Sequence, residues 1–297
     1  MSIALGVDIG GSHITAGWVD LGKAVVLQDT VKRTLIDSGA SVDTIVSGWC
    51  NLLQSSIQDK LHDNIKIGIA MPGPFDYAEG ISLMKEQGKF KALYGLSVRQ
   101  LLSQQLSMPP NHFQFLNDAE SYLQGEVLGG AGKGFEHVLG LTLGTGLGSA
   151  IHSQGQTRDA DLWKMLFKES IAEDYLSTRW FVKRHRELTG KEEAGLKEIL
   201  LNGNTANLHQ LFAEFAQNFC DFLVLLSETY HFTAVVLGGN ISQAHAHFFP
   251  ALKRLLSKQD INVSVRLGML QEEGTLIGAA CQWREGMPER SGICLTI

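Results

Sequence analysis

Asp118 and its neighbour Asn117 directly follow a short apolar segment, Phe113–Leu116. The apolar segment predicts a strand, and residues 119–128 predict a helix. A carboxylate at such a junction lies at the edge of a sheet, where α/β proteins bind ligands. Asp118 is therefore a candidate base that accepts a proton from a substrate hydroxyl, and Asn117 is a candidate for orienting that hydroxyl. The alternative is that Asp118 only caps the helix.

A second carboxylate, Asp8, ends a predicted strand and precedes a turn that contains Gly10, Gly11 and Ser12. Glycine lets backbone amides approach phosphate oxygens closely. An aspartate beside phosphates commonly serves a Mg²⁺ ion, often through water. We therefore expect a phosphate site here with Asp8 as the Mg²⁺ residue, the alternative being an ordinary hairpin turn. The chain contains neither GxGxxG nor GxxxxGK[ST], which excludes the Rossmann and P-loop motifs.

Two further glycine-rich turns follow predicted strands over residues 137–143 and 234–237. The candidate phosphate-binding and nucleotide-binding residues in these turns are Thr142, Gly144, Thr145, Gly146, Gly238, Gly239 and Asn240. The turn that contains Thr142, Gly144, Thr145 and Gly146 can bind phosphates through its amides and hydroxyls. The turn of residues 238–240 lets a flat nucleoside lie against the backbone. Both sets are also compatible with plain turns. Taken with Asp8 and Asp118, they indicate phosphoryl transfer, in which amides and Mg²⁺ bind phosphates and a base takes the acceptor's proton.

The composition excludes several other classes of protein. The chain has 297 residues, a formal net charge of −6 and no basic run, so we expect no nucleic-acid partner. Its apolar runs are shorter than the roughly 20 residues of a membrane span, so we expect no membrane partner. The N-terminus enters a strand without the features of a signal peptide. The four cysteines are widely spaced, which is typical of reduced thiols, and we expect a cytoplasmic protein.

The order of the predicted elements indicates an α/β fold with two similar halves. A strand, a glycine turn and a second strand occur near the N-terminus and again around residues 137–152. Residues 24–31 predict a third strand, and residues 172–187 and 205–229 predict long helices. Gly129–Gly134 is a glycine-rich break that we expect to separate the halves.

The ordered motifs resemble the ROK (repressor, open reading frame, kinase) family of sugar kinases, within the actin, hexokinase and Hsp70 ATPase superfamily. The segments that carry the resemblance are LGVDIGGS (5–12), MPGPFD (71–76), LNDAE (116–120), LTLGTGLG (141–148) and VVLGGNI (235–241). They cover nearly the whole chain in the order of the family.

The resemblance implies two actin-like (ribonuclease H-like) domains around a central cleft. We expect a smaller domain from residues 1–117 plus about 275–297, and a larger one from residues 118–274. The resemblance also implies ATP and Mg²⁺ as cofactors and a hexose-type sugar as the acceptor of the phosphoryl group. We further expect the protein to form a homodimer. Asp118 corresponds to the catalytic base, Asn117 and Gly73 to sugar contacts, and the three glycine turns to the phosphate and adenosine motifs.

The sequence departs from the family pattern in the sugar-binding part. Where the family has Glu-x-Gly-His, the chain has Asp161 and Lys164, and a lysine donates but cannot accept hydrogen bonds. Lys164 either contacts the sugar or pairs with a nearby carboxylate. The cysteine-rich zinc loop of the family is missing, so we expect no zinc site, while Glu173 matches a sugar-contacting glutamate by its spacing to Ser177. In the loop before the central strand, the run Lys89-Phe90-Lys91-Ala92 takes the place of the sugar-contacting asparagine of the family.

These features predict an ATP-dependent kinase that phosphorylates a hexose or hexose derivative, at its 6-hydroxyl. The zinc-free segment around Glu173 also resembles polyphosphate-dependent glucokinases, so polyphosphate is an alternative phosphoryl donor. A third interpretation is a non-catalytic sugar-binding regulator, since some members of the family repress transcription.

Overall fold

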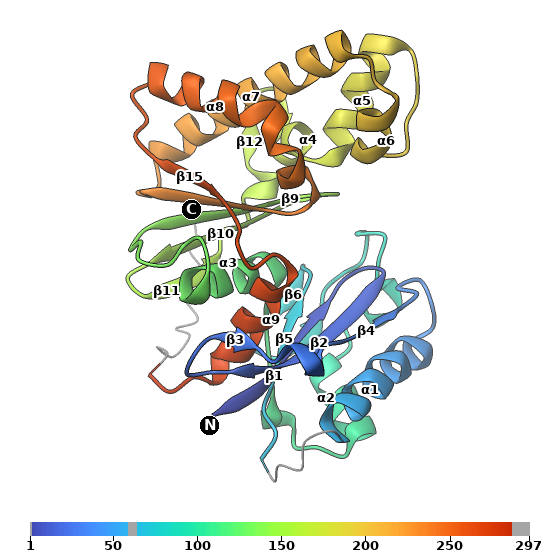
Figure 1. Ribbon diagram of the computed structural model, residues 1–297. Helices are drawn as coiled ribbons and strands as arrows, with labels where there is room; N and C mark the ends of the chain where they lie inside the picture. Colours follow the sequence, from blue (N-terminus) through green and yellow to red (C-terminus); the bar gives the residue numbers. More distant parts are fainter. Residues whose placement is uncertain (1, 59–63, 287–297) are drawn as a thin grey trace. The chain divides into compact units, whose positions relative to one another are not determined.

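The computed structural model describes residues 2–58 and 64–286 (Figure 1). The described chain forms two compact units. The first contains residues 2–58, 64–129, 154–156 and 272–286, and the second contains residues 130–153 and 157–271. The division falls after Gly129, whereas the sequence prediction placed it after Asn117, because the intervening helix packs within the first unit. Residues 287–297, which the prediction placed in the smaller domain, lie outside the described residues.

The sheet of the first unit brings three parallel strand ends to one edge. Its strands are β1 (Ile3–Ile9), β2 (His13–Asp20), β3 (Val25–Val26), β4 (Lys32–Leu35), β5 (Ile67–Met71) and β8 (Phe113–Asn117). The order is β3-β2-β1-β5-β8, with β4 also paired to β2. Strands β1, β5 and β8 are parallel, with Asp8 beside Ala70 and Met71 beside Asn117. The residues that follow these strands therefore gather at the same edge. A small hairpin, β6 (Phe75–Asp76) and β7 (Ile81–Ser82), follows β5.

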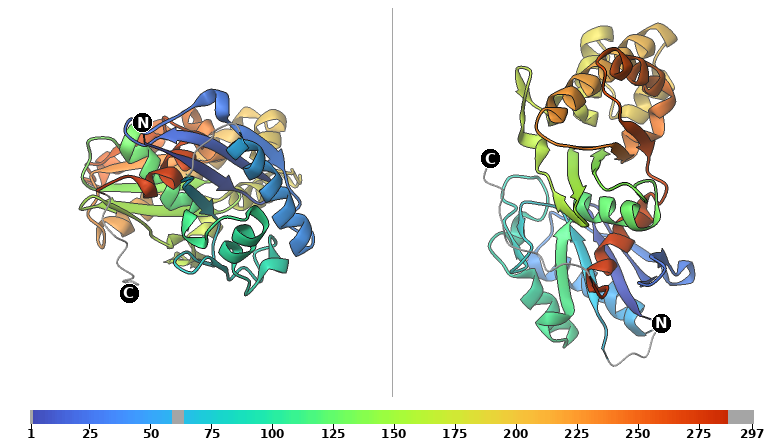
Figure 2. Two further views of the ribbon diagram at one scale, coloured as in Figure 1. Left: turned by 90° about the horizontal axis from the view of Figure 1, so that it is seen from below. Right: turned by 90° about the vertical axis from the view of Figure 1, so that its left-hand side faces the viewer.

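Helices cover both faces of this sheet (Figures 1 and 2). Helices α1 (Val42–Gln58) and α2 (Val98–Leu106) cover one face, where Trp18, Trp49 and Phe115 are fully or nearly fully buried. Helices α3 (Asp118–Gly129) and α9 (Glu272–Ala280) cover the other face. The single-turn helices of the unit are η1 (Gln28–Thr30), η2 (Lys91–Leu93), η3 (Pro110–His112) and η6 (Cys281–Trp283).

Helix α9 lies unusually close to its neighbours because glycines line the contact. A Cβ atom added to Gly6 of β1 or to Gly68 of β5 would collide with backbone carbonyls of α9, and one on Gly278 would collide with the carbonyl of Ser121 in α3. Side chains at these positions would force the helix away from the sheet. Helix α9, the last α-helix of the described chain, is therefore an integral part of the first unit.

The second unit has a sheet of the same kind. Its strands are β9 (Val138–Leu143), β10 (Leu147–Ser153), β11 (Gln156–Asp159), β14 (Ala234–Gly238) and β15 (Ser264–Leu267), in the order β11-β10-β9-β14-β15. Strand β14 runs parallel to β9 with Gly238 beside Thr142, so the turns after these two strands lie at one edge. Strands β12 (Leu166–Phe167) and β13 (Ser170–Ile171) form a separate hairpin.

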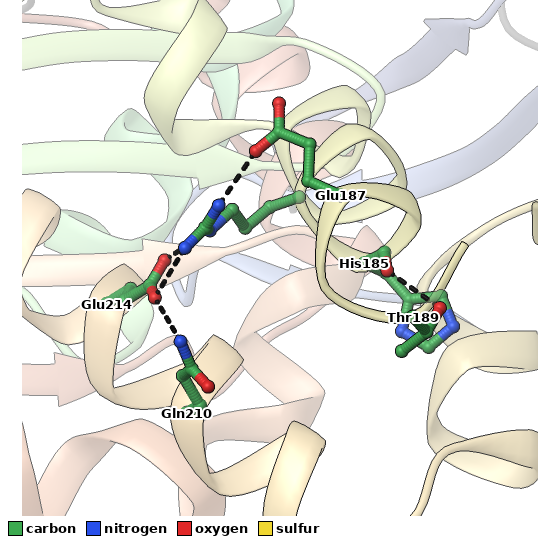
Figure 3. Close-up of polar contacts among 6 residues, drawn as sticks. His185, Glu187, Thr189, Gln210 and Glu214 are labelled. Atoms are coloured by element: carbon green, nitrogen blue, oxygen red, sulfur yellow. Dashed lines mark hydrogen bonds and ion pairs between the residues drawn. The ribbon is translucent and has the colours of Figure 1, made fainter. Parts of the chain in front are cut away.

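Phenylalanine side chains dominate the core of the second unit. Its helices are α4 (Glu173–Leu176), α5 (Thr178–Thr189), α6 (Leu196–Asn202), α7 (Thr205–Ser227) and α8 (His245–Lys258), with the short helices η4 (Leu162–Lys164) and η5 (Asn240–Ala244). Phe215 and Phe219 of α7 pack against Phe248 of α8. Arg184 of α5 binds both carboxylate oxygens of Glu214 on α7, at 2.6 and 2.9 Å, and also Glu187 (Figure 3). These contacts hold α5 against the core.

Two predicted elements differ from the structure. The predicted helix over residues 172–187 is broken at Ser177, whose extended backbone separates α4 from α5. The break lets the amide of Thr178 donate to the carbonyl of Gly144 at 2.8 Å. The predicted strand over residues 24–31 is interrupted by η1, because the Thr30 hydroxyl accepts from the Trp18 amide at 3.0 Å in place of a strand partner.

Candidate functional site

Asn117, rather than Asp118, supplies the main cap of α3. The Oδ1 atom of Asn117 accepts from the amides of Ala119 and Glu120 at 2.8 and 3.2 Å. Asp118 accepts only from the adjacent Ala119 amide, at 2.9 Å, through Oδ1. Its side chain is exposed, and its second oxygen has no hydrogen-bond partner among the described residues. Asp118 therefore contributes one hydrogen bond to the start of α3, while its second carboxylate oxygen is available for a further contact.

Asn117 is held in place by a tyrosine that the sequence analysis missed. The Asn117 amide donates from Nδ2 to the Tyr77 hydroxyl at 3.1 Å, and that hydroxyl donates to the Met71 carbonyl at 3.1 Å. Gly73 lies against the same pair, since an added Cβ would be 3.3 Å from the Tyr77 hydroxyl and 3.9 Å from the Asn117 amide. The two predicted sugar contacts, Gly73 and Asn117, are thus brought together through Tyr77.

Asp8 lies in a strongly charged setting within the first unit. Burial raises the pKa of its carboxyl to about 7, and the negative charges of Asp118 and Glu272 add to the effect. Arg33 and Lys89 act in the opposite direction. Arg33 also binds Glu272, with Nη1 2.5 Å from Oε2. Asp8 and Asp118, which the sequence placed at separate strand ends, are therefore close enough to interact electrostatically.

The first glycine turn is closed by the Gly10 amide, which donates to the His13 carbonyl at 2.9 Å. Ser12 is exposed, and its hydroxyl lies 3.3 Å from Nδ1 of His13. Burial and the charge of Arg33 lower the pKa of His13, which favours a neutral ring. The stem of Lys89 runs over Gly11, because a Cβ added to that glycine would lie 3.5 Å from Cδ of Lys89.

The setting of Asp8 fits a hydrated divalent cation. Two carboxylates that repel each other, one of them with a raised pKa, are stabilised when a cation neutralises them. Mg²⁺ keeps most of its water ligands and needs only one or two direct carboxylates. Among residues 2–58 and 64–286, no group of three or more His, Cys, Asp or Glu side chains is arranged to hold a metal ion directly. A water-mediated site at Asp8 needs no such group.

The second glycine turn is tight and is held from the side by helices α4 and α5. Within the turn, the Gly144 amide donates to the Gly146 carbonyl at 3.0 Å, and Thr145 is exposed. Thr142, which lies near the end of strand β9 just before the turn, is partly buried. The first contact that holds the turn is the hydrogen bond from the Thr178 amide, at the start of α5, to the Gly144 carbonyl.

The carboxylate of Glu173, on α4, makes the second contact that holds this turn. Its Oε2 atom accepts from the Leu147 amide at 2.9 Å, and its Oε1 atom pairs with Arg179. A Cβ added to Gly146 would lie 2.5 Å from Oε2, so the carboxylate occupies the space that a side chain would need. Both oxygens of Glu173 are thus engaged within the second unit. We call Glu173, Arg179 and the Leu147 amide the loop clamp.

The third glycine turn adjoins the second. Gly239 has a φ of 80°, and a Cβ there would collide with the Leu143 backbone, so glycine is required. Asn240 is exposed and begins η5. Since Gly238 pairs with Thr142, the predicted adenosine and phosphate motifs share one sheet edge.

Lys164 pairs with Asp161. The two side chains form an ion pair three residues apart, and both are more than a third exposed. Asp161 itself has a left-handed backbone with a φ of 50°. The structure therefore contains an ion pair between Lys164 and a nearby carboxylate, at a surface that solvent reaches.

The predicted site residues thus form two groups. Asp8, Gly10, Gly11, Ser12, Gly73, Asn117 and Asp118 gather at one sheet edge in the first unit, and Thr142, Gly144, Thr145, Gly146, Glu173, Gly238, Gly239 and Asn240 gather at one edge in the second. Tyr77, Arg179 and Glu272 were missed. The contacts of Tyr77 with Asn117 and of Glu272 with Arg33 are distant in the sequence, so no local pattern marks them. Arg179 is only six residues from Glu173, but the break between α4 and α5 lies between the two.

Each unit has glycine turns at one end of its sheet, and an exposed carboxylate, Asp118, lies at the same sheet edge as the first of them, so the protein has the arrangement of the actin-like α/β fold. The chain belongs to the ROK family, because the family model described as "ROK family" matches residues 4–159. The sequence-based expectations of the family and of the fold class are confirmed.

A named relative and two solved structures are similar to this chain. A glucokinase of Thermotoga maritima is 31% identical over 153 residues, which cover 51% of this chain and 44% of that protein, so the match spans less than half of the relative. A ROK family glucokinase from Streptomyces griseus, solved with glucose and AMPPNP, has a TM-score of 0.75 at 22% identity and covers 96% of this chain and 100% of its own.

The second solved structure is an inorganic polyphosphate/ATP-glucomannokinase from Arthrobacter sp. strain KM. It has a TM-score of 0.70 at 22% identity and covers 94% of this chain and 97% of its own. At these identities the likeness establishes the two-domain actin-like fold. Within the described ranges, no helix combines the length and apolar character needed to cross a bilayer.

Proposed function

We propose that the protein is an ATP-dependent sugar kinase, which transfers the γ-phosphoryl group to a hydroxyl, the 6-hydroxyl, of a hexose or hexose derivative. The observation that carries the proposal is the free second oxygen of Asp118, next to the Asn117–Tyr77 pair. A base must be reachable and correctly oriented before its basicity matters. The membership of the ROK family and the glucokinase relative support the choice of a sugar as acceptor.

In the proposed reaction, Asn117 and Gly73 orient the sugar, and Asp118 accepts the proton of its hydroxyl. The sugar oxygen forms a bond to the γ-phosphorus as the bond from that phosphorus to the bridging oxygen breaks, and ADP leaves. Mg²⁺, held through water at Asp8, would supply positive charge at the phosphates. Amides and hydroxyls of the glycine turns bind the phosphate oxygens, and Gly238, Gly239 and Asn240 contact the nucleoside.

We propose that Asp161 and Glu173 face the sugar as acceptors of hydrogen bonds, as in the family pattern. Glu173 would then also stabilise the second glycine turn, because its carboxylate accepts a hydrogen bond from the Leu147 amide in the loop clamp. A change at Glu173 would then affect both the sugar and the phosphoryl donor. We further propose a cytoplasmic homodimer without nucleic-acid or membrane partners.

The test of the activity is ADP release in a coupled assay over glucose, mannose, fructose, N-acetylglucosamine and N-acetylmannosamine. We expect turnover of at least one sugar, and we expect Asp118→Asn to lower kcat by about 10²–10⁴-fold with little change in sugar affinity. A variant that retains activity within about threefold of the wild type, a difference of about 0.7 kcal/mol, would exclude Asp118 as the base.

The same assay decides between donors when polyphosphate replaces ATP. Sugar phosphorylation with polyphosphate alone would make the protein a polyphosphate-dependent glucokinase. Sugar binding without turnover with either donor would make it a non-catalytic regulator.

A further inference from the structure

Lys89 is a partly buried cation with no ion-pair partner in the described part of the chain. Lysine side chains usually extend into water or pair with a carboxylate when they are buried. Other lysines of the protein follow that rule, since Lys168 pairs with Asp221 at 2.8 Å and Lys32 donates to the Ser55 carbonyl at 2.7 Å. No hydrogen bond or ion pair joins Lys89 to any described residue.

The backbone beside Lys89 is firmly anchored. Phe90, the next residue, is fully buried and packs edge-on against Trp49, with ring centroids 5.4 Å apart. Phe90 also has a left-handed backbone with a φ of 54°, and its amide donates to the Ser38 carbonyl at 2.8 Å. The buried ring and the backbone hydrogen bond of Phe90 thus anchor the main chain directly beside Lys89.

From this anchored backbone, the stem of Lys89 lies over the first glycine turn. The 3.5 Å approach of its Cδ atom to the Cβ position of Gly11 is an ordinary van der Waals contact. Its ammonium group also acts electrostatically on Asp8, at the end of β1. The cation therefore belongs to the same sheet edge as the predicted phosphate turn and the proposed Mg²⁺ residue.

We propose that Lys89 is a further catalytic residue, which binds the terminal phosphoryl group of the donor as it moves to the acceptor. Phosphoryl transfer spreads negative charge over the equatorial oxygens of the transferred group, and a preorganised cation stabilises that charge. Because the ammonium group of Lys89 has no ion-pair partner among the described residues, no such pair has to be broken when the phosphoryl group arrives. The inference rests on the proposed kinase function.

The test compares Lys89→Met, which removes the charge but keeps most of the stem, with Lys89→Arg, which keeps the charge. Lys91→Met is the matched control, since Lys91 is exposed on the same segment. Each purified variant is first checked by thermal denaturation. We measure kcat and KM with the donor and sugar that the wild type uses, and the affinities for ADP and for AMPPNP.

We expect Lys89→Met to lower kcat by about 10²–10³-fold, as the loss of a charge-stabilising group does. Its affinity for AMPPNP should fall by about tenfold or more, while its affinity for ADP, which lacks the terminal phosphoryl group, stays within about twofold of the wild type. Lys89→Arg should recover part of the activity, and Lys91→Met should resemble the wild type.

A Lys89→Met variant with wild-type kcat would overturn the inference. So would an equal loss of ADP and AMPPNP affinity, which would indicate a general role in the structure, and so would an equal loss of kcat in Lys91→Met. If the wild-type protein neither turns over a sugar nor binds either nucleotide, the proposed kinase function fails and the inference fails with it. Turnover in the wild type combined with an unaffected Lys89→Met variant refutes the inference alone.

Discussion

Replacing Asp8 by asparagine should make the protein more stable at alkaline pH while removing a residue needed for function. The carboxyl of Asp8 has its pKa raised from 3.8 to about 7, first by burial and then by the charges of Asp118 and Glu272. Its ionised form is therefore disfavoured in the folded protein. Asparagine has nearly the same shape and carries no charge, so it should relieve the repulsion.

The direction in which the stability of the wild-type protein changes with pH follows from proton linkage. Because the folded-state pKa is the higher one, the folded protein holds this proton more tightly than the unfolded chain does. The resulting stabilisation is fully present below pH 3.8 and is lost as the pH rises through about 7. The difference between the two pKa values corresponds to at most about 4 kcal/mol. Because Asp8 is partly exposed to solvent, screening reduces this, and we expect about 1–3 kcal/mol.

The assay is thermal and urea denaturation of wild type and Asp8→Asn at pH 5 and pH 8, with EDTA present to remove divalent cations. At pH 5 Asp8 is protonated in the folded protein but already ionised in the unfolded chain, so the variant should exceed the wild type in stability by less than half of the difference at pH 8. At pH 8 the variant should unfold at a higher temperature, by about 2–4 °C for each kcal/mol. In the presence of Mg²⁺, ATP and sugar, the same variant should lose turnover.

The matched control is Glu86→Gln, which removes an exposed carboxylate from the loop that precedes Lys89. It should not change the dependence of stability on pH. Equal stabilities of wild type and Asp8→Asn at pH 8 would refute the reasoning, as would a stability difference that is the same at both pH values.

Three other predictions concern the second unit. Gly146→Ala should raise the KM for the donor by about tenfold by displacing Glu173, so in a double-mutant cycle it should add no further loss to Glu173→Ala. Additive losses would show that the alanine acts elsewhere. Hydrogen bonds from Arg184 lower the pKa of Glu214, so the stability that Glu214→Gln loses at pH 7 should vanish as the pH falls well below 4.5 in urea denaturation. A loss that persists at pH 3 would contradict this. Lys164→Ala should free Asp161 and change the ranking of sugars by kcat/KM by about tenfold, and an unchanged ranking would place the pair outside the acceptor site.

Local sequence patterns were sufficient where one segment determines its own structure. The strand and turn that carry Asp8, and the strand that ends at Asn117, occur as predicted because apolar runs and glycines specify them directly. The motif order also led to the correct family and fold class. The break at Ser177 could not be predicted this way, because its reason is a hydrogen bond to Gly144, far away in the sequence.

The tertiary contacts around the candidate site could not be predicted from local sequence patterns either. Tyr77 reaches Asn117 only because β5 and β8 are neighbours in the sheet, and Arg33 reaches Glu272 only because the last helix returns to the first unit. Both contacts depend on the tertiary structure, and no periodic pattern in the sequence predicts them. The pairing of Lys164 with Asp161 is different, since a spacing of three residues makes such a pair visible in the sequence as one of two options.

The position of α9 also affects the order in which the chain can fold as the ribosome releases it. Domains generally fold as units during synthesis, from the N-terminus onward. The second unit has all of its strands and helices once Gln271 has emerged. The first unit, although most of it is made earlier, must wait for Ala280 before the face of β1 and β5 around Gly6 and Gly68 is covered. The part of the protein synthesised first is therefore completed last, and until then its uncovered sheet face is the surface most open to aggregation or to a chaperone.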